Sequence, residues 1–144
     1  MADERATYPV TMAVPTRWAD NDQYGHVNNV AYYAWFDTVV NGWLMRATGV
    51  DTSALPAIGL VVETGCRYLR PLSFPETADV GLRVERLGRS SITYDLAVFT
   101  QGRDDPAAVA RFVHVYVDRA TRASVDVPAV IRSVLTPVMR PAPA

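Results

Sequence analysis

The sequence predicts an α+β domain in which a curved antiparallel β-sheet packs against one long buried helix. One long segment in the first third of the chain has helical periodicity and is apolar on most of its sides. Five other segments have the alternating or β-branched composition of strands. Only short breaks separate the last four strands, and short connections favour antiparallel pairing.

The first element is a predicted strand from Val10 to Trp18, in which apolar residues alternate with small or polar ones. A period of two is typical of a half-buried strand. Pro15 cannot donate a hydrogen bond to a neighbouring strand, so it predicts a place at the sheet edge. The polar run from Asp20 to Gly25 then predicts a turn.

The second element is a predicted helix that begins at Asn28 or Asn29 and ends near Thr48. Either asparagine can cap the first turn, and Gly49 is well placed to end the last one. Apolar residues recur at helical spacing and also cover much of the remaining surface, which is typical of a buried helix. The main stripe consists of Tyr32, Phe36, Val39, Val40, Trp43 and Ala47.

The rest of the chain reads as strands joined by short breaks, spaced for hairpins or a meander. The predicted strands are Leu60–Leu69, Ala78–Leu87, Ser91–Thr100 and Val109–Asp118. A short helix is predicted from Pro128 to about Leu135, with the proline at its first position.

These elements predict a single domain over residues 1–137 and a flexible C-terminal tail over residues 138–144, whose prolines suit an extended end. One helix cannot cover the face of a curved sheet completely, and the edge strands stay open. The geometry therefore predicts self-association through an edge.

Composition excludes several kinds of chemistry. All 14 basic residues are arginine, so a lysine Schiff base and a P-loop lysine are excluded. One cysteine allows no internal disulfide, and two histidines cannot build a three-histidine metal site. We therefore expect no metal and no cofactor. What remains is chemistry by carboxylates, imidazoles, hydroxyls, arginines and backbone dipoles.

Charge and hydropathy set further expectations. The net charge of −1 gives no basic field for nucleic acid. The apolar stretches are far shorter than a membrane span, and the acidic start of the chain has no apolar signal core behind it. We expect a cytoplasmic protein with no nucleic-acid or membrane partner.

The segment from Arg17 to Asn29 places two acids, a glycine, a histidine and two amides directly before the buried helix. The N–H groups at a helix N-terminus can hold a carbonyl oxygen as it becomes an oxyanion, and one such donor is worth about 10²–10³ in rate. A nearby carboxylate can act as a base toward water or as a nucleophile. The segment thus predicts an acyl-transfer site, and its alternative interpretation is a capped helix behind a polar loop.

Three blocks resemble the hotdog-fold acyl-CoA thioesterases of the 4-hydroxybenzoyl-CoA thioesterase-like type. They are Arg17-Trp18-x-Asp20-x-Asp22-x-x-Gly25-His26-Val27-Asn28-Asn29-x-x-Tyr32, Arg67-Tyr68-Leu69-Arg70-Pro71 and Gly88-Arg89-Ser90-Ser91. The resemblance spans Tyr8 to Leu135. It implies the hotdog fold, a curled antiparallel sheet wrapped around one long central helix, and an active site formed between two subunits.

The resemblance also implies roles for single residues. Asp22 stands at the position of the catalytic carboxylate, and the N–H near Asn29 would polarise the thioester carbonyl. Apart from the resemblance, the position of His26 suits two roles: it could orient water or substrate, or it could bond to backbone in a tight loop. The predicted substrate-binding residues are Tyr24, Gly25, Asn28, Arg89, Ser90 and Ser91, of which the last three would contact the phosphates of coenzyme A. The His-Val-Asn-Asn run after the glycine is more typical of relatives that act on fatty acyl groups.

Other polar residues have competing interpretations. Asp37 is a second candidate for the catalytic carboxylate, or an acid paired with an arginine at a subunit interface. Glu63 could face the site or pair with Arg67 on the same strand. We expect Asp20 to end the strand or cap the turn, and His114 to be a packed histidine between aromatic neighbours.

The predicted function is hydrolysis of an acyl-CoA thioester to the free acid and coenzyme A, by a homodimer or homotetramer. The alternatives are an acyl carrier protein thioesterase of a biosynthetic pathway and a catalytically silent acyl-CoA-binding protein. A hotdog dehydratase or hydratase is disfavoured by the Asp-x-x-Gly block. Because the chain has no lysine, only an arginine can hold the coenzyme A phosphates with a full, fixed charge, and the candidate is Arg89 or another arginine near the hairpin.

Overall fold

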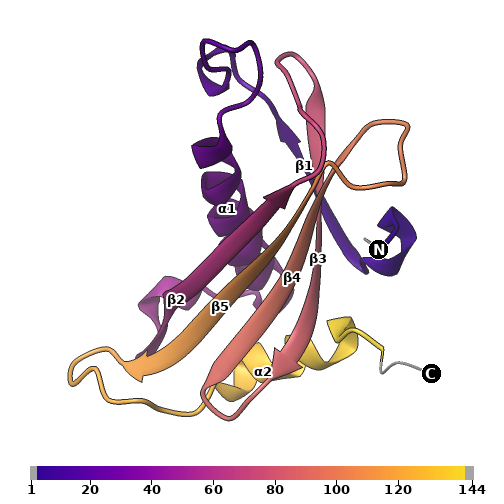
Figure 1. The fold of residues 1–144 in the computed structure, drawn as a ribbon. Helices are drawn as coiled ribbons and strands as arrows, with labels where there is room; N and C mark the ends of the chain where they lie inside the picture. The colour runs from indigo at the N-terminus through magenta and orange to yellow at the C-terminus, as the bar shows by residue number, and fades with distance from the viewer. Residues whose placement is uncertain (1–2, 142–144) are drawn as a thin grey trace.

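The computed structural model describes residues 3–141 and contains one five-stranded antiparallel sheet in the order β1-β3-β4-β5-β2 (Figure 1). The strands are β1 (Val10–Pro15), β2 (Ala57–Tyr68), β3 (Thr77–Leu87), β4 (Ser91–Thr100) and β5 (Ala108–Asp118). The helices are α1 (Asn29–Thr48) and α2 (Ala129–Leu135), with single 3-10 turns at Arg5–Thr7, Trp18–Asp20, Thr52–Ala54 and Thr136–Val138. The predicted α+β hotdog fold is confirmed.

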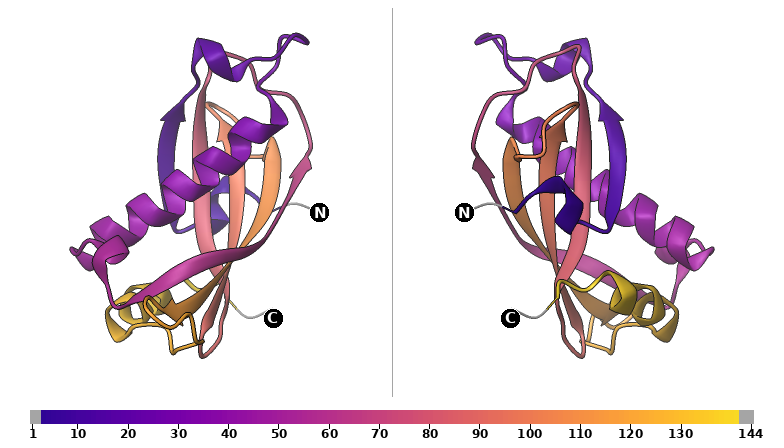
Figure 2. Two further views of the ribbon diagram at one scale, coloured as in Figure 1. Left: turned by 90° about the vertical axis from the view of Figure 1, so that its left-hand side faces the viewer. Right: turned by 90° about the vertical axis from the view of Figure 1, so that its right-hand side faces the viewer.

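Helix α1 runs obliquely across the concave face of the sheet, as both views in Figure 2 show. Alternate residues of β3, β4 and β5 point to that face, so the core lies between the sheet and one side of the helix. The buried residues of α1 are Tyr32, Trp35, Phe36, Val39, Val40 and Leu44.

The opposite side of α1 is open, which differs from the prediction of a helix buried on most sides. Val30 is 67% exposed and Met45 is 36% exposed, while Ala47 of the predicted stripe is also exposed. A single sheet covers only one side of a helix, so the apolar residues of the other side stay uncovered in one chain. This surface is available to a second copy of the chain.

Both ends of α1 lie where the sequence predicted them, and the structure shows which of the two asparagines caps the helix. Asn28 is the N-cap, and its side-chain oxygen accepts a hydrogen bond of 3.0 Å from the N–H of Val30. Gly49 ends the helix with φ of +73°, a left-handed conformation that glycine adopts without strain.

Strand β2 forms one edge of the sheet and pairs with β5 rather than with β3, the next strand along the chain. Only β3, β4 and β5 form a meander. The ladder between β2 and β5 has a bulge between Val61 and Glu63. Leu60, Val61 and Val62 are 36%, 45% and 59% exposed, so this edge presents an apolar strand to solvent.

Several boundaries differ from the prediction. The first strand ends at Pro15, because Trp18–Asp20 forms a 3-10 turn closed by the Asp20 side chain. Pro128 is the N-cap of α2 with extended backbone, not its first helical residue. Within the expected tail, Met139 bridges to Val84 on β3; residues 142–144 lie outside the described residues.

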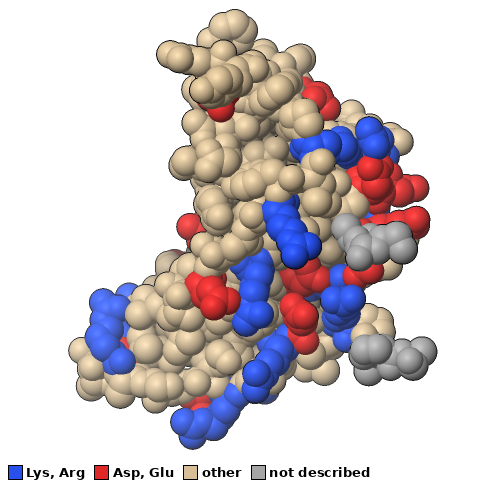
Figure 3. Space-filling view, in the orientation of Figure 1, with Lys and Arg blue, Asp and Glu red and all other residues tan. Residues whose placement is uncertain are grey.

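Charge is unevenly distributed over the surface. In Figure 3 the arginines lie over the outer face of the sheet and at the lower end, whereas the upper end of that face, which holds the loop before α1, shows none. No helix within residues 3–141 has the length and apolar character needed to cross a membrane.

Candidate active site

A groove of about 510 Å³ lies where the loop before α1 meets the end of β2. The residues that line it are Asp22, Tyr24, His26, Val27, Asn29, Tyr32, Tyr68, Leu69, Arg70 and Pro71. The groove therefore brings together four of the predicted site residues, which are Asp22, Tyr24, His26 and Asn29. We call it the Asp22 groove.

The loop that carries Asp22 is held by backbone hydrogen bonds. Asn21 and Val27 form an antiparallel bridge, and the N–H of Asp22 donates to the carbonyl of His26 at 2.9 Å. Gly25 has φ of +80°, the left-handed conformation that lets the loop reverse direction. A loop this short and closed presents its side chains at defined positions.

The connection between β2 and β3 anchors the same loop from outside. The N–H of Val27 donates to the carbonyl of Leu72 at 2.7 Å, and the Ser73 hydroxyl donates to the carbonyl of Gly25 at 2.9 Å. Predicted as a substrate-binding residue, Gly25 thus acts in the structure through its backbone and does not line the groove.

The Asp22 carboxylate is half-buried and only partly engaged. Its Oδ1 atom accepts a hydrogen bond of 2.9 Å from the N–H of Tyr24, which orients the side chain. Within residues 3–141, Oδ2 accepts no hydrogen bond from the protein. One carboxylate oxygen is therefore free to take a proton from water or to attack a carbonyl carbon.

The first turn of α1 leaves one backbone donor without an acceptor within residues 3–141, on a residue that lines the same groove. The N–H of Val30 donates to the Asn28 side chain at 3.0 Å, and the N–H of Ala31 donates to the Asn28 carbonyl at 2.9 Å. Within the described chain, the N–H of Asn29 donates to no protein acceptor. The helix dipole places partial positive charge at this position.

Tyr68, at the end of β2, ties the sheet to the helix N-terminus. Its hydroxyl donates a hydrogen bond of 2.9 Å to the carbonyl oxygen of Asn29. Burial is the main cause that raises the pKa of Tyr68 above its ordinary value, so the hydroxyl stays protonated and remains a donor. Tyr32 packs edge-on against this ring at 5.0 Å, and burial raises the pKa of Tyr32 to about 12.

These two tyrosines were not among the predicted site residues. The signal that could have found Tyr68 is its place in the second block of the resemblance, and Tyr32 closes the first block. Tyr32 is predicted as part of the main apolar stripe of the helix, because a tyrosine at helical spacing in an apolar run is usually a packing residue.

Asp20 has the structural role that the sequence predicted. It is 3% exposed, and its carboxylate accepts hydrogen bonds from the backbone N–H of Arg17 at 2.8 Å and from the Arg17 guanidinium at 2.8 and 3.1 Å. Burial favours the protonated acid, but the hydrogen bonds and charge of Arg17 outweigh it and lower the pKa of Asp20. Asp20 lies outside the groove lining.

The predicted coenzyme A contacts lie at the opposite end of the molecule. Arg89 and Ser90 form the turn between β3 and β4, and Ser91 is the first residue of β4. Arg89 lines a separate pocket with Ala57, at the start of β2, and pairs with Asp126 at 3.3 Å. One chain by itself does not bring Arg89 to the Asp22 groove.

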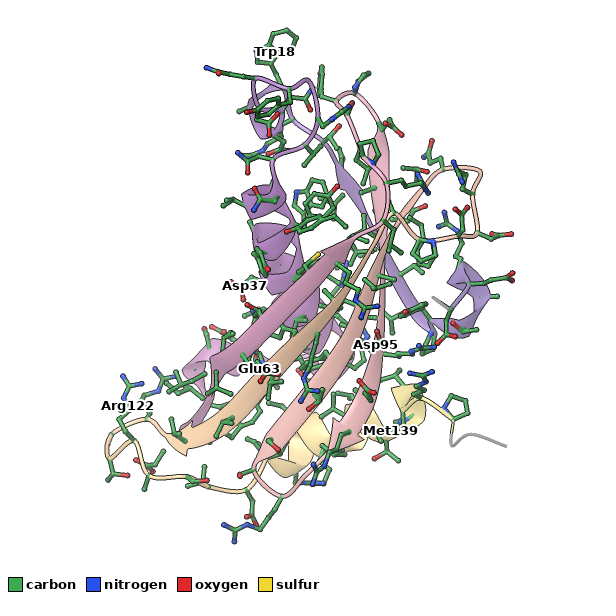
Figure 4. The ribbon with its side chains drawn as sticks, viewed as in Figure 1. Trp18, Asp37, Glu63, Asp95, Arg122 and Met139 are labelled. Atoms are coloured by element: carbon green, nitrogen blue, oxygen red, sulfur yellow. The ribbon has the colours of Figure 1, made fainter. Side chains whose placement is uncertain are left out.

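Neither of the other carboxylates lines the groove. Asp37 lies exposed halfway along α1 (Figure 4). Glu63 lies on the outer face of the sheet, where its carboxylate pairs with Arg111 at 2.7 Å instead of the expected Arg67. Arg111 lies opposite Gly65 on the neighbouring strand β5, diagonally across from Glu63, and is therefore closer to Glu63 than Arg67 is, four residues further along β2.

His114 is a packed histidine, as predicted. It is 2% exposed and lies on β5 among Tyr94, Phe112 and Tyr116.

Comparison with known proteins agrees with the fold. A family model described as the thioesterase-like superfamily matches residues 16–135. The structure of the PA5185 protein from Pseudomonas aeruginosa is 45% identical, with a TM-score of 0.93 over 98% of this chain and 99% of that one.

Two further solved structures are similar. A thioesterase from Thermus thermophilus, complexed with coenzyme A and zinc, is 26% identical, with a TM-score of 0.77 over 92% of this chain and 95% of that one. A gentisyl-coenzyme A thioesterase, at 22% identity and a TM-score of 0.77 over 88% of this chain and 99% of that one, shares the fold. With its hotdog fold, the chain belongs to the thioesterase-like superfamily and is a thioesterase.

Proposed function

We propose that this protein hydrolyses acyl-CoA thioesters at the Asp22 groove. The observation that carries the proposal is that two groups without a hydrogen-bond partner within residues 3–141, one carboxylate oxygen of Asp22 and the backbone N–H of Asn29, belong to residues of the same groove. Their positions suit hydrolysis because the carboxylate can activate the nucleophile while the N–H holds the oxygen that becomes negative.

Two routes use the same atoms. As a general base, Asp22 takes a proton from water, and the hydroxide adds to the thioester carbonyl carbon. The N–H of Asn29 holds the resulting oxyanion; the C–S bond then breaks, and the thiolate takes the proton from Asp22. As a nucleophile, the Asp22 carboxylate itself adds to the carbonyl carbon, expels the thiolate and forms a mixed anhydride that water hydrolyses.

A second copy of the chain would complete the site. Tyr68, at the end of β2, lines the Asp22 groove, whereas Ala57, at the start of β2, lines the pocket of Arg89. Two β2 edges paired antiparallel about their midpoints bring these opposite ends together. The exposed apolar edge of β2 supports this dimer, in which Arg89 of one copy reaches coenzyme A bound at the Asp22 groove of the other.

Arg89 can readily exchange its ion pair with Asp126 for a contact with a coenzyme A phosphate. Its ion pair with Asp126 is exposed on both sides, at 76% and 69%, and such surface pairs contribute little. A coenzyme A phosphate, with its greater charge and several acceptor oxygens, would displace the Asp126 carboxylate.

A thiol-release screen over short, long and aromatic acyl-CoAs, run beside the Asp22→Asn variant, tests the proposal. We expect the wild-type protein to release coenzyme A from at least one class and the variant to lose that activity. Saturable acyl-CoA binding without thiol release would instead identify a silent binding protein. Release only from acyl carrier protein thioesters would reassign the carrier.

A further inference from the structure

A second cavity, of about 340 Å³, lies under the C-terminal half of α1. Asn41, Leu44 and Met45 line it from α1, Thr52, Ser53 and Arg119 from loops, Ile58 and Gly59 from β2, and His114 and Tyr116 from β5. It shares no lining residue with the Asp22 groove. About 22 Å of helix separates Asn29 from Leu44, so no small ligand fills both spaces within one chain.

The floor of this cavity holds a buried polar atom without a partner. His114 is 2% exposed, and within residues 3–141 its Nδ1 atom has no hydrogen-bond partner. Three aromatic rings surround the imidazole edge-on, with centroids at 5.0 Å for Phe112, 5.9 Å for Tyr94 and 6.2 Å for Tyr116. A buried polar group left unpaired destabilises the folded state, so its retention calls for an explanation.

Gly59 packs directly against the imidazole where both residues line the cavity. A Cβ at this position would lie 3.1 Å from Cζ of Tyr116 and 3.2 Å from Cγ and Nδ1 of His114. Any larger residue would therefore press on both rings and fill the space above them. The glycine and the unpaired imidazole are two independent features of one cavity, and both favour a ligand at this position.

Gly59 lies near the start of β2 and lines this cavity. In the proposed dimer, antiparallel pairing of two β2 strands places the start of each strand beside the Asp22 groove of the other copy. We propose that the cavity receives the acyl chain of a substrate held at the partner's Asp22 groove, and that His114 binds a hydroxyl group on that chain. The inference rests on the proposed function and names the substrate class that the site favours, a straight-chain acyl-CoA with a hydroxyl group at its far end.

The charge state of the cavity selects a hydroxyl over a carboxylate. Burial lowers the pKa of His114 to about 4, so at neutral pH the imidazole is uncharged, with one N–H donor and one acceptor nitrogen. A hydroxyl group both donates and accepts, so it can pair with whichever ring nitrogen faces the ligand, whereas an ionised carboxylate only accepts. The cavity's one cation among the described lining residues, Arg119, already donates to the backbone carbonyls of Ser53 and Leu55.

The test compares ω-hydroxyacyl-CoAs of increasing chain length with the unsubstituted acyl-CoA of each length. At the length that reaches His114, we expect kcat/KM for the hydroxylated member to exceed that of its pair roughly ten-fold, the value of one net hydrogen bond. His114→Phe keeps an aromatic ring in the aromatic cluster and should reduce the ratio to about one, while His114→Gln should restore part of it.

Tyr94→Phe is the matched control, because it removes a different buried polar group, a hydroxyl with no hydrogen-bond partner within residues 3–141, from the same sheet face without altering the cavity lining. Its ratio should equal that of the wild type. Equal ratios in wild type and His114→Phe at every chain length would overturn the inference and leave the thioesterase assignment intact.

A binding measurement separates the two proposals. In the Asp22→Asn variant, the ring ¹⁵N resonances of His114 should move on addition of the hydroxylated substrate and not of its unsubstituted pair. If no acyl-CoA is hydrolysed by the wild type, the proposed function fails, yet this shift still reports on the cavity. An unmoved His114 resonance at saturating substrate would overturn the inference.

Discussion

The hydroxyl of Tyr68 donates a 2.9 Å hydrogen bond to the carbonyl oxygen of Asn29, and this bond joins the end of an edge strand to the first turn of α1. The same peptide segment carries the one first-turn N–H that has no acceptor within residues 3–141. The orientation of the proposed oxyanion donor therefore depends on a contact between segments far apart in the sequence.

Replacing Tyr68 by phenylalanine should lower kcat several-fold and change KM little, because the ring still packs against Tyr32 while the helix N-terminus loses its tether. Steady-state kinetics on the best acyl-CoA from the screen checks this. A change in KM alone would mean that Tyr68 contacts the ground state of the substrate instead.

Asp22→Asn should abolish hydrolysis while leaving folding and coenzyme A binding nearly intact, because the asparagine oxygen can still accept the N–H of Tyr24. Asp20→Asn is the contrasting variant. It removes the charge of a buried carboxylate that pairs with the exposed Arg17 side chain, and it should lower the free energy of unfolding. Full turnover by Asp22→Asn would remove Asp22 from the mechanism.

Arg89→Ala should raise KM with little change in kcat, because the phosphates bind far from the reacting carbonyl. The difference in KM between the variant and the wild type should shrink as salt is added, because salt screens the attraction between Arg89 and the phosphates in the wild type. Arg103→Ala is the matched control, an exposed arginine paired with Asp105 in the turn between β4 and β5. An equal rise in KM for both variants would indicate only a loss of overall charge.

Mixing the Asp22→Asn and Arg89→Ala variants tests whether two copies share a site. In a hybrid dimer, one site combines both substitutions and the other has neither. At low substrate concentration, where the Arg89→Ala protein is slow, re-associated mixtures should exceed the mean activity of the two parents. Activity equal to that mean would contradict the shared site, because it would show that Arg89 of one copy does not serve the Asp22 groove of the other.

The buried imidazole predicts a pH dependence of stability. The pKa of His114 falls from about 6.5 in the unfolded chain to about 4 in the folded protein. As pH decreases through this interval, the unfolded state binds a proton that the folded state does not, so stability falls by at most about 3 kcal/mol. Urea unfolding of wild type and His114→Phe should show this difference, because the variant lacks the titrating group and shares the remaining ones.

Local features of the chain predicted the helices and most strands well. The bounds of β4 agree with the prediction, and α1 begins after Asn28 and ends before Gly49 because capping depends on residues within one turn. The cluster of Asp22, Tyr24, His26 and Asn29 was also predictable, since a tight loop leading into a helix keeps them near each other.

Relations between distant segments were not predictable in this way. The placement of β2 beside β5, the partnership of Glu63 with Arg111, and the open side of α1 all depend on which faces meet after folding. Residues such as His114 and Gly59 have ordinary local patterns in the sequence, and only their juxtaposition forms a cavity.

The sequence by itself determined the elements, the chemistry of the loop before α1 and the absence of lysine, because these depend on residue type and short-range order. The tertiary structure alone decided which groups share a space. It brought Tyr68 to Asn29, kept Arg89 away from Asp22 within one chain, and buried His114 beside Gly59, because long-range packing of strands sets distances that local order leaves free.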